Sequence, residues 1–202
     1  ISQEYLGPLQ TVNFYNKTTK NIIATIQNKS NFDFGCTSVE LLRTGTGSAQ
    51  AWGQFTDQQT SSKLIRIVPT NTNNNAPYSV KLYLTEAEIN GWLSSSGNKI
   101  TDLNLAKTVQ DITVVNPGAI PVFSSTAVIN SFGAANDKQI SGDFTGFGYF
   151  AISKVYSAPA CLNGINTLSA GISGSAYQWQ VNTGSGYVNL SNNSMYTGVN
   201  TA

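Results

Sequence analysis

Histidine is absent from the 202-residue sequence, which removes several kinds of active site at once. Ser-His-Asp and Cys-His sites need an imidazole as general base, and the common zinc sites need one as a ligand. Two carboxyl groups are enough for a glycosidase, so the ten Asp and Glu residues leave that chemistry formally open. No pair of them stands out, because the aspartates stand in polar turn sequences, at Asp33, Asp57, Asp102, Asp111, Asp137 and Asp143. We therefore expect no catalytic residue, no cofactor and no metal ion.

Charged residues are also scarce. They make up 10% of the chain, and 11 Lys and Arg against 10 Asp and Glu give a formal net charge of +1. Proteins that bind nucleic acid or anionic membrane surfaces carry a basic excess, which this chain lacks. No run of about 18 apolar residues exists, so we expect no membrane insertion. The abundance of Thr, Asn, Gly and aromatic residues favours a secreted protein, although composition alone leaves the cytosol open.

Only two cysteines are present, Cys36 and Cys161, 125 positions apart and without the CxxC spacing of metal sites. They can pair with each other in an oxidising compartment, or Cys161 can pair with a residue beyond 202. The sequence leaves these alternatives open, including free thiols.

Short strand patterns recur through most of the chain. They are rich in Val, Ile, Thr and aromatic residues, and clusters of Gly, Asn or Pro separate them. Within residues 78–84, Val80, Leu82 and Leu84 alternate with Lys81 and Tyr83. This alternation predicts a strand with one face buried and the other exposed to solvent. This predicts an all-β fold, an antiparallel β-sandwich, with strands at residues 10–16, 21–28, 37–44, 63–70, 78–84, 111–116, 127–132 and 148–155. Its predicted core contains Phe14, Ile23, Val39, Leu64, Ile67, Val80, Leu82, Ile89, Trp92, Phe144 and Phe150.

Residues 85–93 place Glu86 and Glu88 close to Trp92 and so raise the question of a catalytic corner. Residues two apart on a helix lie roughly 200° apart around its axis, so these carboxylates cannot converge on one substrate atom. Thr85 and Glu88 instead fit the capping box that opens a helix. We therefore expect a short structural helix, which ends near the following Gly-Asn pair.

Two other motifs admit a functional and a structural interpretation. Residues 69–78 carry four Asn, as a calcium or sugar loop can, but Asn also favours turns, and we expect a hairpin loop. Residues 140–153 contain Gly142, Gly146 and Gly148, which follow no phosphate-binding motif and indicate closely packed backbone.

Trp52 and Trp92 can form an aromatic platform for sugar rings. Core or edge packing of both rings is the more ordinary outcome in a domain of this size. The platform is the basis of the alternative function, a carbohydrate-binding accessory module of a secreted enzyme such as a protease or glycosidase.

The pattern changes after Val155. Residues 158–160 are predicted to be a linker between a sandwich module at 1–157 and a second domain at 161–202. In that domain a Cys is followed about 18 positions later by Trp179, which is the first half of an immunoglobulin-like pattern. Strands are expected at 166–170, 176–182 and 187–190. We expect a partial, truncated immunoglobulin-like β domain.

Three stretches together resemble a known module: "FGCTSVELLRTGTG" (34–47), "IRIVPTNTNNNAPYSVKLYLTEAEINGW" (65–92) and "ISGDFTGFGYFAIS" (140–153). They are similar to a β-rich module of very large secreted and cell-surface proteins of Bacteroidetes bacteria. The tail "YQWQVNTGSGYVNLSNNSMYTG" (177–198) resembles the immunoglobulin-like repeats that follow it in such chains.

This resemblance implies a non-catalytic structural or adhesive module, in a gliding or surface-adhesin context. It implies export as cargo of the type IX secretion machinery, with a sorting domain beyond residue 202. The implied partners are that machinery, neighbouring domains of the same polypeptide and surface glycans. We expect an extracellular location, secreted or at the cell surface, and no nucleic-acid partner.

Overall fold

The computed structural model describes residues 1–50, 59–116, 118–133, 136–154, 176–182, 186–192 and 196–201. The chain divides into two compact units, residues 1–156 and 157–202. The predicted linker at 158–160 lies outside the described residues. Each unit is described by itself.

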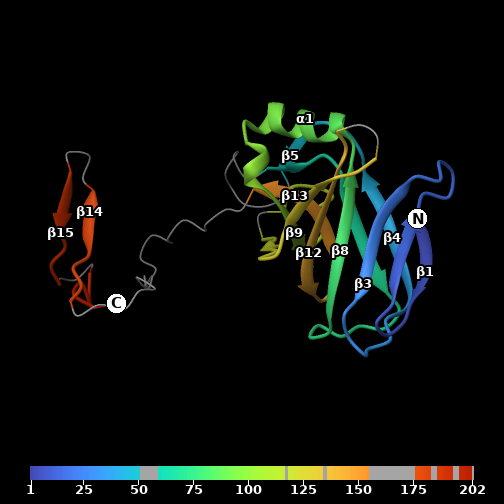
Figure 1. The fold of residues 1–202 in the computed structure, drawn as a ribbon, viewed down its shortest axis with the longest axis horizontal. Helices are drawn as coiled ribbons and strands as arrows, with labels where there is room; N and C mark the ends of the chain where they lie inside the picture. The colour runs from blue at the N-terminus through green and yellow to red at the C-terminus, as the bar shows by residue number, and fades with distance from the viewer. Residues whose placement is uncertain are drawn as a thin grey trace. The chain divides into compact units, whose positions relative to one another are not determined.

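The larger unit is a sandwich of two antiparallel sheets (Figure 1). In the described part of the chain the first sheet has eight strands: β1 (Ser2–Leu6), β4 (Gly35–Arg43), β5 (Ser48–Gln50), β6 (Gln59–Ser61), β7 (Leu64–Pro69), β9 (Leu103–Thr108), β10 (Val122–Phe123) and β13 (Tyr149–Lys154). The second sheet has the order β11-β12-β8-β3-β2, with bounds Val128–Ser131, Lys138–Thr145, Pro77–Leu84, Ile22–Asn28 and Thr11–Tyr15. The predicted all-β, antiparallel sandwich is confirmed.

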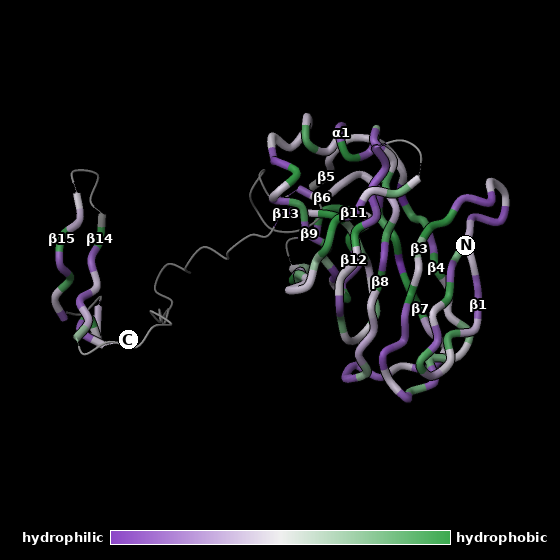
Figure 2. The backbone as a smooth tube through the Cα atoms, viewed as in Figure 1, coloured by the Kyte–Doolittle hydropathy of each residue, from purple (hydrophilic) through white to green (hydrophobic). Residues whose placement is uncertain are grey.

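The core lies between the sheets because the strands alternate as the sequence predicts. Along β8 every second residue is buried, from Tyr78 to Leu84, while the residues between them are half-buried. Figure 2 shows this alternation of hydrophobic and hydrophilic positions along the strands. Every predicted core residue is buried, and Phe14, Val39, Leu64, Val80, Trp92 and Phe150 have no exposed surface at all. The predicted core is confirmed except for Leu64, which belongs to a second buried cluster with Ala106, Ile112, Ala119 and Ala151.

The single α-helix of the described residues, α1 (Glu86–Ser96), lies across one end of the sandwich (Figure 1), and a short 3-10 helix follows it at Ile100–Asp102. Thr85 accepts a hydrogen bond from the backbone N–H of Glu88, and the Glu88 carboxylate accepts one from the backbone N–H of Thr85. Gly97 closes the helix in the left-handed conformation, at φ 70°. The capping box and the helix end at the Gly-Asn pair are confirmed, and the helix extends three residues past the predicted range of 85–93.

Two predicted elements are wrong. Residues 111–116 form no strand, because the Asp111 carboxylate accepts hydrogen bonds from the backbone N–H and the hydroxyl of Thr113 and turns the chain. Residues 69–78 form no hairpin loop, because β7 and β8 belong to different sheets and the loop connects the two layers. Strands β1, β5, β6, β9, β10 and β12 were not predicted.

The glycines after β11 pack against backbone and side chains, as predicted. A Cβ on Gly148 would lie 2.2 Å from the carbonyl oxygen of Thr108, and one on Gly142 would lie 2.5 Å from the hydroxyl oxygen of Ser124. The absence of a side chain at Gly148 lets the end of β9 approach the start of β13 closely, and Gly142 lets β12 approach Ser124 after β10.

In the described residues of the smaller unit, β14 (Gln180–Asn182) pairs antiparallel with β15 (Tyr187–Asn189). The indole N–H of Trp179 donates to the carbonyl oxygen of Thr201 over 2.8 Å. Both strands are shorter than predicted, and the strand predicted at 166–170 lies outside the described residues. Among the helices that the structure describes, none has the length and apolarity to cross a bilayer.

Candidate functional site

The predicted tryptophan platform does not form at Trp92. Trp92 lies on the buried face of α1 and packs into the core, so its ring offers no face to a sugar, and the structure contradicts this half of the platform. Its indole N–H has no hydrogen-bond partner in the described structure. Trp52 lies outside the described residues, so its half of the platform remains a prediction.

Glu86 and Glu88 belong to two separate hydrogen-bond networks. Glu88 accepts from the Thr85 N–H at 2.8 Å and pairs with the Lys63 ammonium at 3.2 Å, and both side chains are about 15% exposed. Glu86 accepts from the side-chain amide of Asn136 at 2.9 Å. The two carboxylates therefore bind different partners, in agreement with the structural interpretation.

Several aspartates hold backbone N–H groups at turns and at helix ends. The Asp33 carboxylate accepts from the N–H of Gly35 at 2.8 Å, and the Asp102 carboxylate accepts from the N–H of Lys99 at 2.9 Å. Asp137 accepts from the N–H of Glu86, the first residue of α1, at 2.8 Å. Hydrogen bonds from Thr113 lower the pKa of the Asp111 carboxyl. Asp57 lies outside the described residues.

Asp143 is the aspartate with a basic partner. Its carboxylate accepts a hydrogen bond from the Lys29 ammonium at 2.6 Å and another from the hydroxyl of Ser79. The hydrogen bond from Lys29, followed by that from Ser79, lowers the pKa of the Asp143 carboxyl. The carboxylate therefore ties β12 to the loop after β3.

Metal ligands do not gather in the part of the chain that the structure describes, where no three His, Cys, Asp or Glu side chains lie together. Cys36 is an exposed, free thiol on β4. Cys161 lies outside the described residues, so the alternatives for its pairing stay as the sequence left them.

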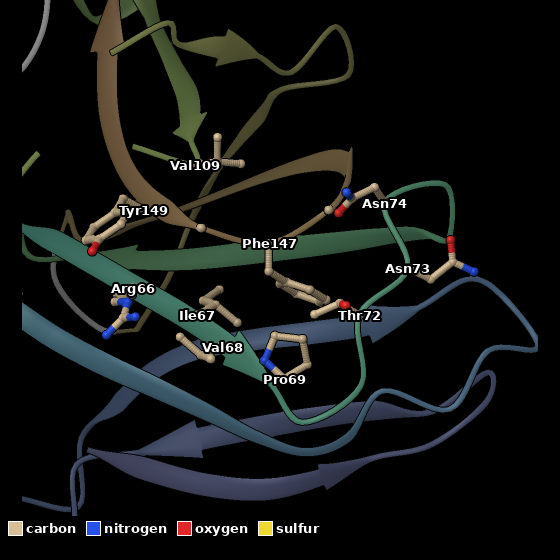
Figure 3. A pocket seen from close by; sticks show the side chains of 12 residues that line it. Arg66, Ile67, Val68, Pro69, Thr72, Asn73, Asn74, Val109, Phe147 and Tyr149 are labelled. Atoms are coloured by element: carbon tan, nitrogen blue, oxygen red, sulfur yellow. The ribbon is translucent and has the colours of Figure 1, made fainter. Parts of the chain in front are cut away.

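A hollow of about 260 Å³ lies beside the loop between β7 and β8, at the end of the sandwich opposite α1, and Figure 3 shows the side chains that line it. It is lined by residues 66–69 of β7, 72–74 of the Asn-rich loop, Val109 after β9, and 146–149 between β12 and β13. We call it the loop-end hollow. Three regions that are distant in the sequence, residues 66–74, Val109 and residues 146–149, meet here because β7, β9 and β13 are neighbours in one sheet.

The floor of the loop-end hollow is held by ring and charge contacts. The Phe147 ring stacks on the buried Tyr78 ring, with centroids 4.0 Å apart and planes inclined by 13°. The Arg66 guanidinium lies 5.6 Å from the centroid of the Tyr149 ring and 3.5 Å from the Glu40 carboxylate. These contacts hold the ring and the guanidinium in defined positions.

The Asn-rich loop forms the rim of the hollow and is fastened to the sandwich. Asn71 donates to the carbonyl oxygen of Asp33 at 3.1 Å, and the Asn73 side chain accepts from the N–H of Asn75 at 2.9 Å. The sequence signal for this site was the run of Asn, which we interpreted as turn chemistry alone. Arg66 and Tyr149 carried no signal, because only the fold brings them to this loop.

A second hollow, of about 400 Å³, lies beside Lys107. The Lys107 ammonium donates to the carbonyl oxygens of Thr145 at 2.6 Å and Gly146 at 2.9 Å. Burial lowers the pKa of this ammonium. These two hydrogen bonds stabilise the turn at residues 145–146, which borders the loop-end hollow.

No protein-family model, no curated protein and no solved structure matches this chain.

Proposed function

We propose that this chain is a non-catalytic structural and adhesive module of a large secreted or cell-surface protein. The observation that carries the proposal is the use of its carboxylates. Asp33, Glu88, Asp102 and Asp137 each accept a hydrogen bond from a backbone N–H at 2.8 to 2.9 Å. Such bonds stabilise turns and helix starts, and an acid so engaged is poorly placed to transfer protons to a substrate.

The shape of the larger unit supports the adhesive part of the proposal. β13 leads from Tyr149 at the loop-end hollow to Lys154, about 17 Å further along the strand. Lys154 pairs with Leu103 and so lies at the end of the sandwich that α1 covers. The loop-end hollow, at the opposite end, is the surface to which we assign the adhesive contact.

The resemblance of residues 34–47, 65–92 and 140–153 to Bacteroidetes surface modules supplies the biological setting. In that setting the protein is cargo of the type IX secretion machinery and works beside other domains of the same polypeptide. Its sparse charge is in keeping with contact through uncharged polar groups.

Localisation tests the proposal in the bacterium that produces the protein. An antibody raised against the 202-residue chain should label intact cells, or detect the protein in the medium, without permeabilisation. A cytoplasmic protein, probed in parallel, controls for cell lysis. Labelling that appears only after permeabilisation would contradict the proposed location.

A carbohydrate-binding accessory module of a secreted enzyme is the second candidate. The loop-end hollow favours it, since uncharged polar side chains and aromatic rings meet there. Such a module and an adhesive one differ in the domains that accompany them, so the sequence of the neighbouring polypeptide separates the two.

A further inference from the structure

The Asn74 side chain stands apart from the other asparagines of its loop. Asn71 and Asn73 use their side chains to hold backbone groups. Asn74 is exposed, and its amide has no hydrogen-bond partner among the described residues. Its side-chain oxygen lies 3.1 Å from the position that a Cβ on Gly146 would take, so the amide leans over the turn that borders the loop-end hollow. It offers both donors and an acceptor to a ligand.

Arg66 offers further donors without an excess of charge. A guanidinium has five N–H donors, and the one ion pair that Arg66 forms among the described residues, with Glu40 at 3.5 Å, leaves several of them unused. Its side chain is 42% exposed, so these donors reach the solvent. Because Glu40 balances the positive charge, the hollow does not select an anion.

Apolar side chains of β7 and of the segments after β9 and β12 also line the loop-end hollow. Val109 is 66% exposed and Val68 is 38% exposed, and Phe147 and Tyr149 are half-buried beside them (Figure 3). None of the lining residues is acidic, which disfavours a metal cation. β7 pairs with β4 along most of its length and with β13 at Ile65 and Arg66, which limits the room for an added strand there.

We propose that the loop-end hollow binds a neutral saccharide residue, with the Asn74 amide and the Arg66 guanidinium on its hydroxyl groups and the exposed valines and Phe147 against its C–H face. A sugar ring presents both kinds of surface, and mixed polar and apolar linings are what small-ligand sites provide. The volume, about 260 Å³, lies just below the range of about 300 to 1,000 Å³ for sites that enclose drug-sized ligands. The site therefore suits a terminal residue of a glycan. This inference names the ligand of the adhesive surface and rests on the proposed function for its biological setting.

The expected affinity is low. The binding free energy per atom of ordinary ligands, applied to one sugar ring, gives a Kd on the order of 1 mM. Adhesion by such a site depends on many copies acting together, as on a cell surface.

Nuclear magnetic resonance titration of the full chain tests the site. The neutral probes are glucose, galactose, mannose, fucose and N-acetylglucosamine, and glucuronic acid is the charged comparison. At least one neutral probe should shift the amide signals of residues 72–74 and 146–149, with an affinity that changes little between about 0.05 M and about 0.5 M salt.

Variants then locate the site. Asn74→Ala should weaken binding about fivefold, the effect of one lost hydrogen bond. Asn75→Ala is the matched control, because Asn75 is exposed on the same loop and does not line the hollow; it should leave the Kd unchanged. Val109→Trp fills the hollow from an exposed position and should abolish binding. Spectra that are unchanged away from the hollow confirm that each variant is folded.

Two results would overturn the inference. One is the absence of shifts with every neutral probe at about 10 mM, roughly ten times the expected Kd. The other is sugar binding that Asn74→Ala and Val109→Trp leave intact, since the ligand would then bind elsewhere. If no sugar binds but the antibody labels intact cells, the saccharide site is wrong and the proposed function stands. If a sugar binds but the antibody labels only permeabilised cells, the saccharide site stands and the proposed location is wrong.

Discussion

Single polar side chains satisfy many of the backbone groups that the turns and the helix start leave unpaired. Thr85 is the clearest case, because its hydroxyl accepts the N–H of Glu88 over 3.2 Å while Glu88 returns the bond. Replacing Thr85 by Ala should lower the free energy of unfolding by about 1 kcal/mol, the usual effect of losing an N-cap. Denaturant unfolding of the full chain measures this change.

Thr18→Ala is the matched control for that substitution. Thr18 is exposed, and its hydroxyl makes no hydrogen bond among the described residues. Its replacement should leave the stability nearly unchanged. Equal losses for the two variants would argue that the capping bond contributes nothing.

The pair of Lys29 and Asp143 makes stability depend on pH. The Asp143 carboxyl has its pKa lowered in the folded state from an ordinary value of 3.8, mainly by the Lys29 hydrogen bond. A lowered carboxyl pKa contributes stability that is present above the unfolded value and is lost as the pH falls through the folded value. Lys29→Met should therefore be less stable than the unaltered protein at about pH 7, and the difference should close as the pH falls below about 4.

Unfolding curves at a series of pH values check this prediction. Lys17→Met is a suitable control, since Lys17 is exposed and forms no ion pair among the described residues. A difference between Lys29→Met and the unaltered protein that persists unchanged at acid pH would assign the effect of Lys29 to packing instead.

At the scale of elements, α1 depends on a close approach to the loop after β4. A Cβ on Gly91 would lie 1.4 Å from the carbonyl oxygen of Thr46, so only glycine permits this contact. Ala at a free helical position stabilises by up to about 1 kcal/mol relative to Gly. Gly91→Ala should instead destabilise the fold by about 1 to 3 kcal/mol, because helix and loop must separate.

Thermal unfolding of Gly91→Ala, compared with Asn90→Ala, measures this contact. Asn90 is exposed on the same helix, and its replacement should be neutral or slightly stabilising. A Gly91→Ala protein as stable as the unaltered one would show that α1 does not lie against Thr46.

Elements whose signal is local could be predicted from the sequence. The alternation of β8 and the capping box of α1 each lie within a few consecutive residues. Residues 111–116 show the converse, because their β-branched composition indicated a strand while the Asp111 side chain formed a turn. β12 was missed since its Gly142 and Asp143 interrupt the apolar pattern, and their partners, Ser124 and Lys29, are distant in the sequence.

At the scale of the whole molecule, the properties that the sequence could not supply are those of tertiary contact. The sequence does not show whether Trp92 is an exposed platform residue or a core residue. Only the position of α1 on the sandwich decides that it is buried. The loop-end hollow likewise exists because β7, β9 and β13 are neighbours, which brings Arg66, Val109 and Tyr149 beside one loop. The run of Asn residues marked the loop that borders this hollow. Turn formation accounts for Asn71 and Asn73 but not for Asn74.

The acidic side chains of the sandwich bind backbone N–H groups of the sandwich itself. The most direct measurement is the free energy of unfolding of the full chain with Asp33→Ala, Asp102→Ala and Asp137→Ala, each half-buried, beside Glu4→Ala, an exposed control without a partner among the described residues. We predict a loss of about 1 kcal/mol for each aspartate and no change for Glu4. Active-site residues are often held at a cost to stability, so that replacing them stabilises the protein. A gain in stability on replacing any of these aspartates would therefore contradict the account.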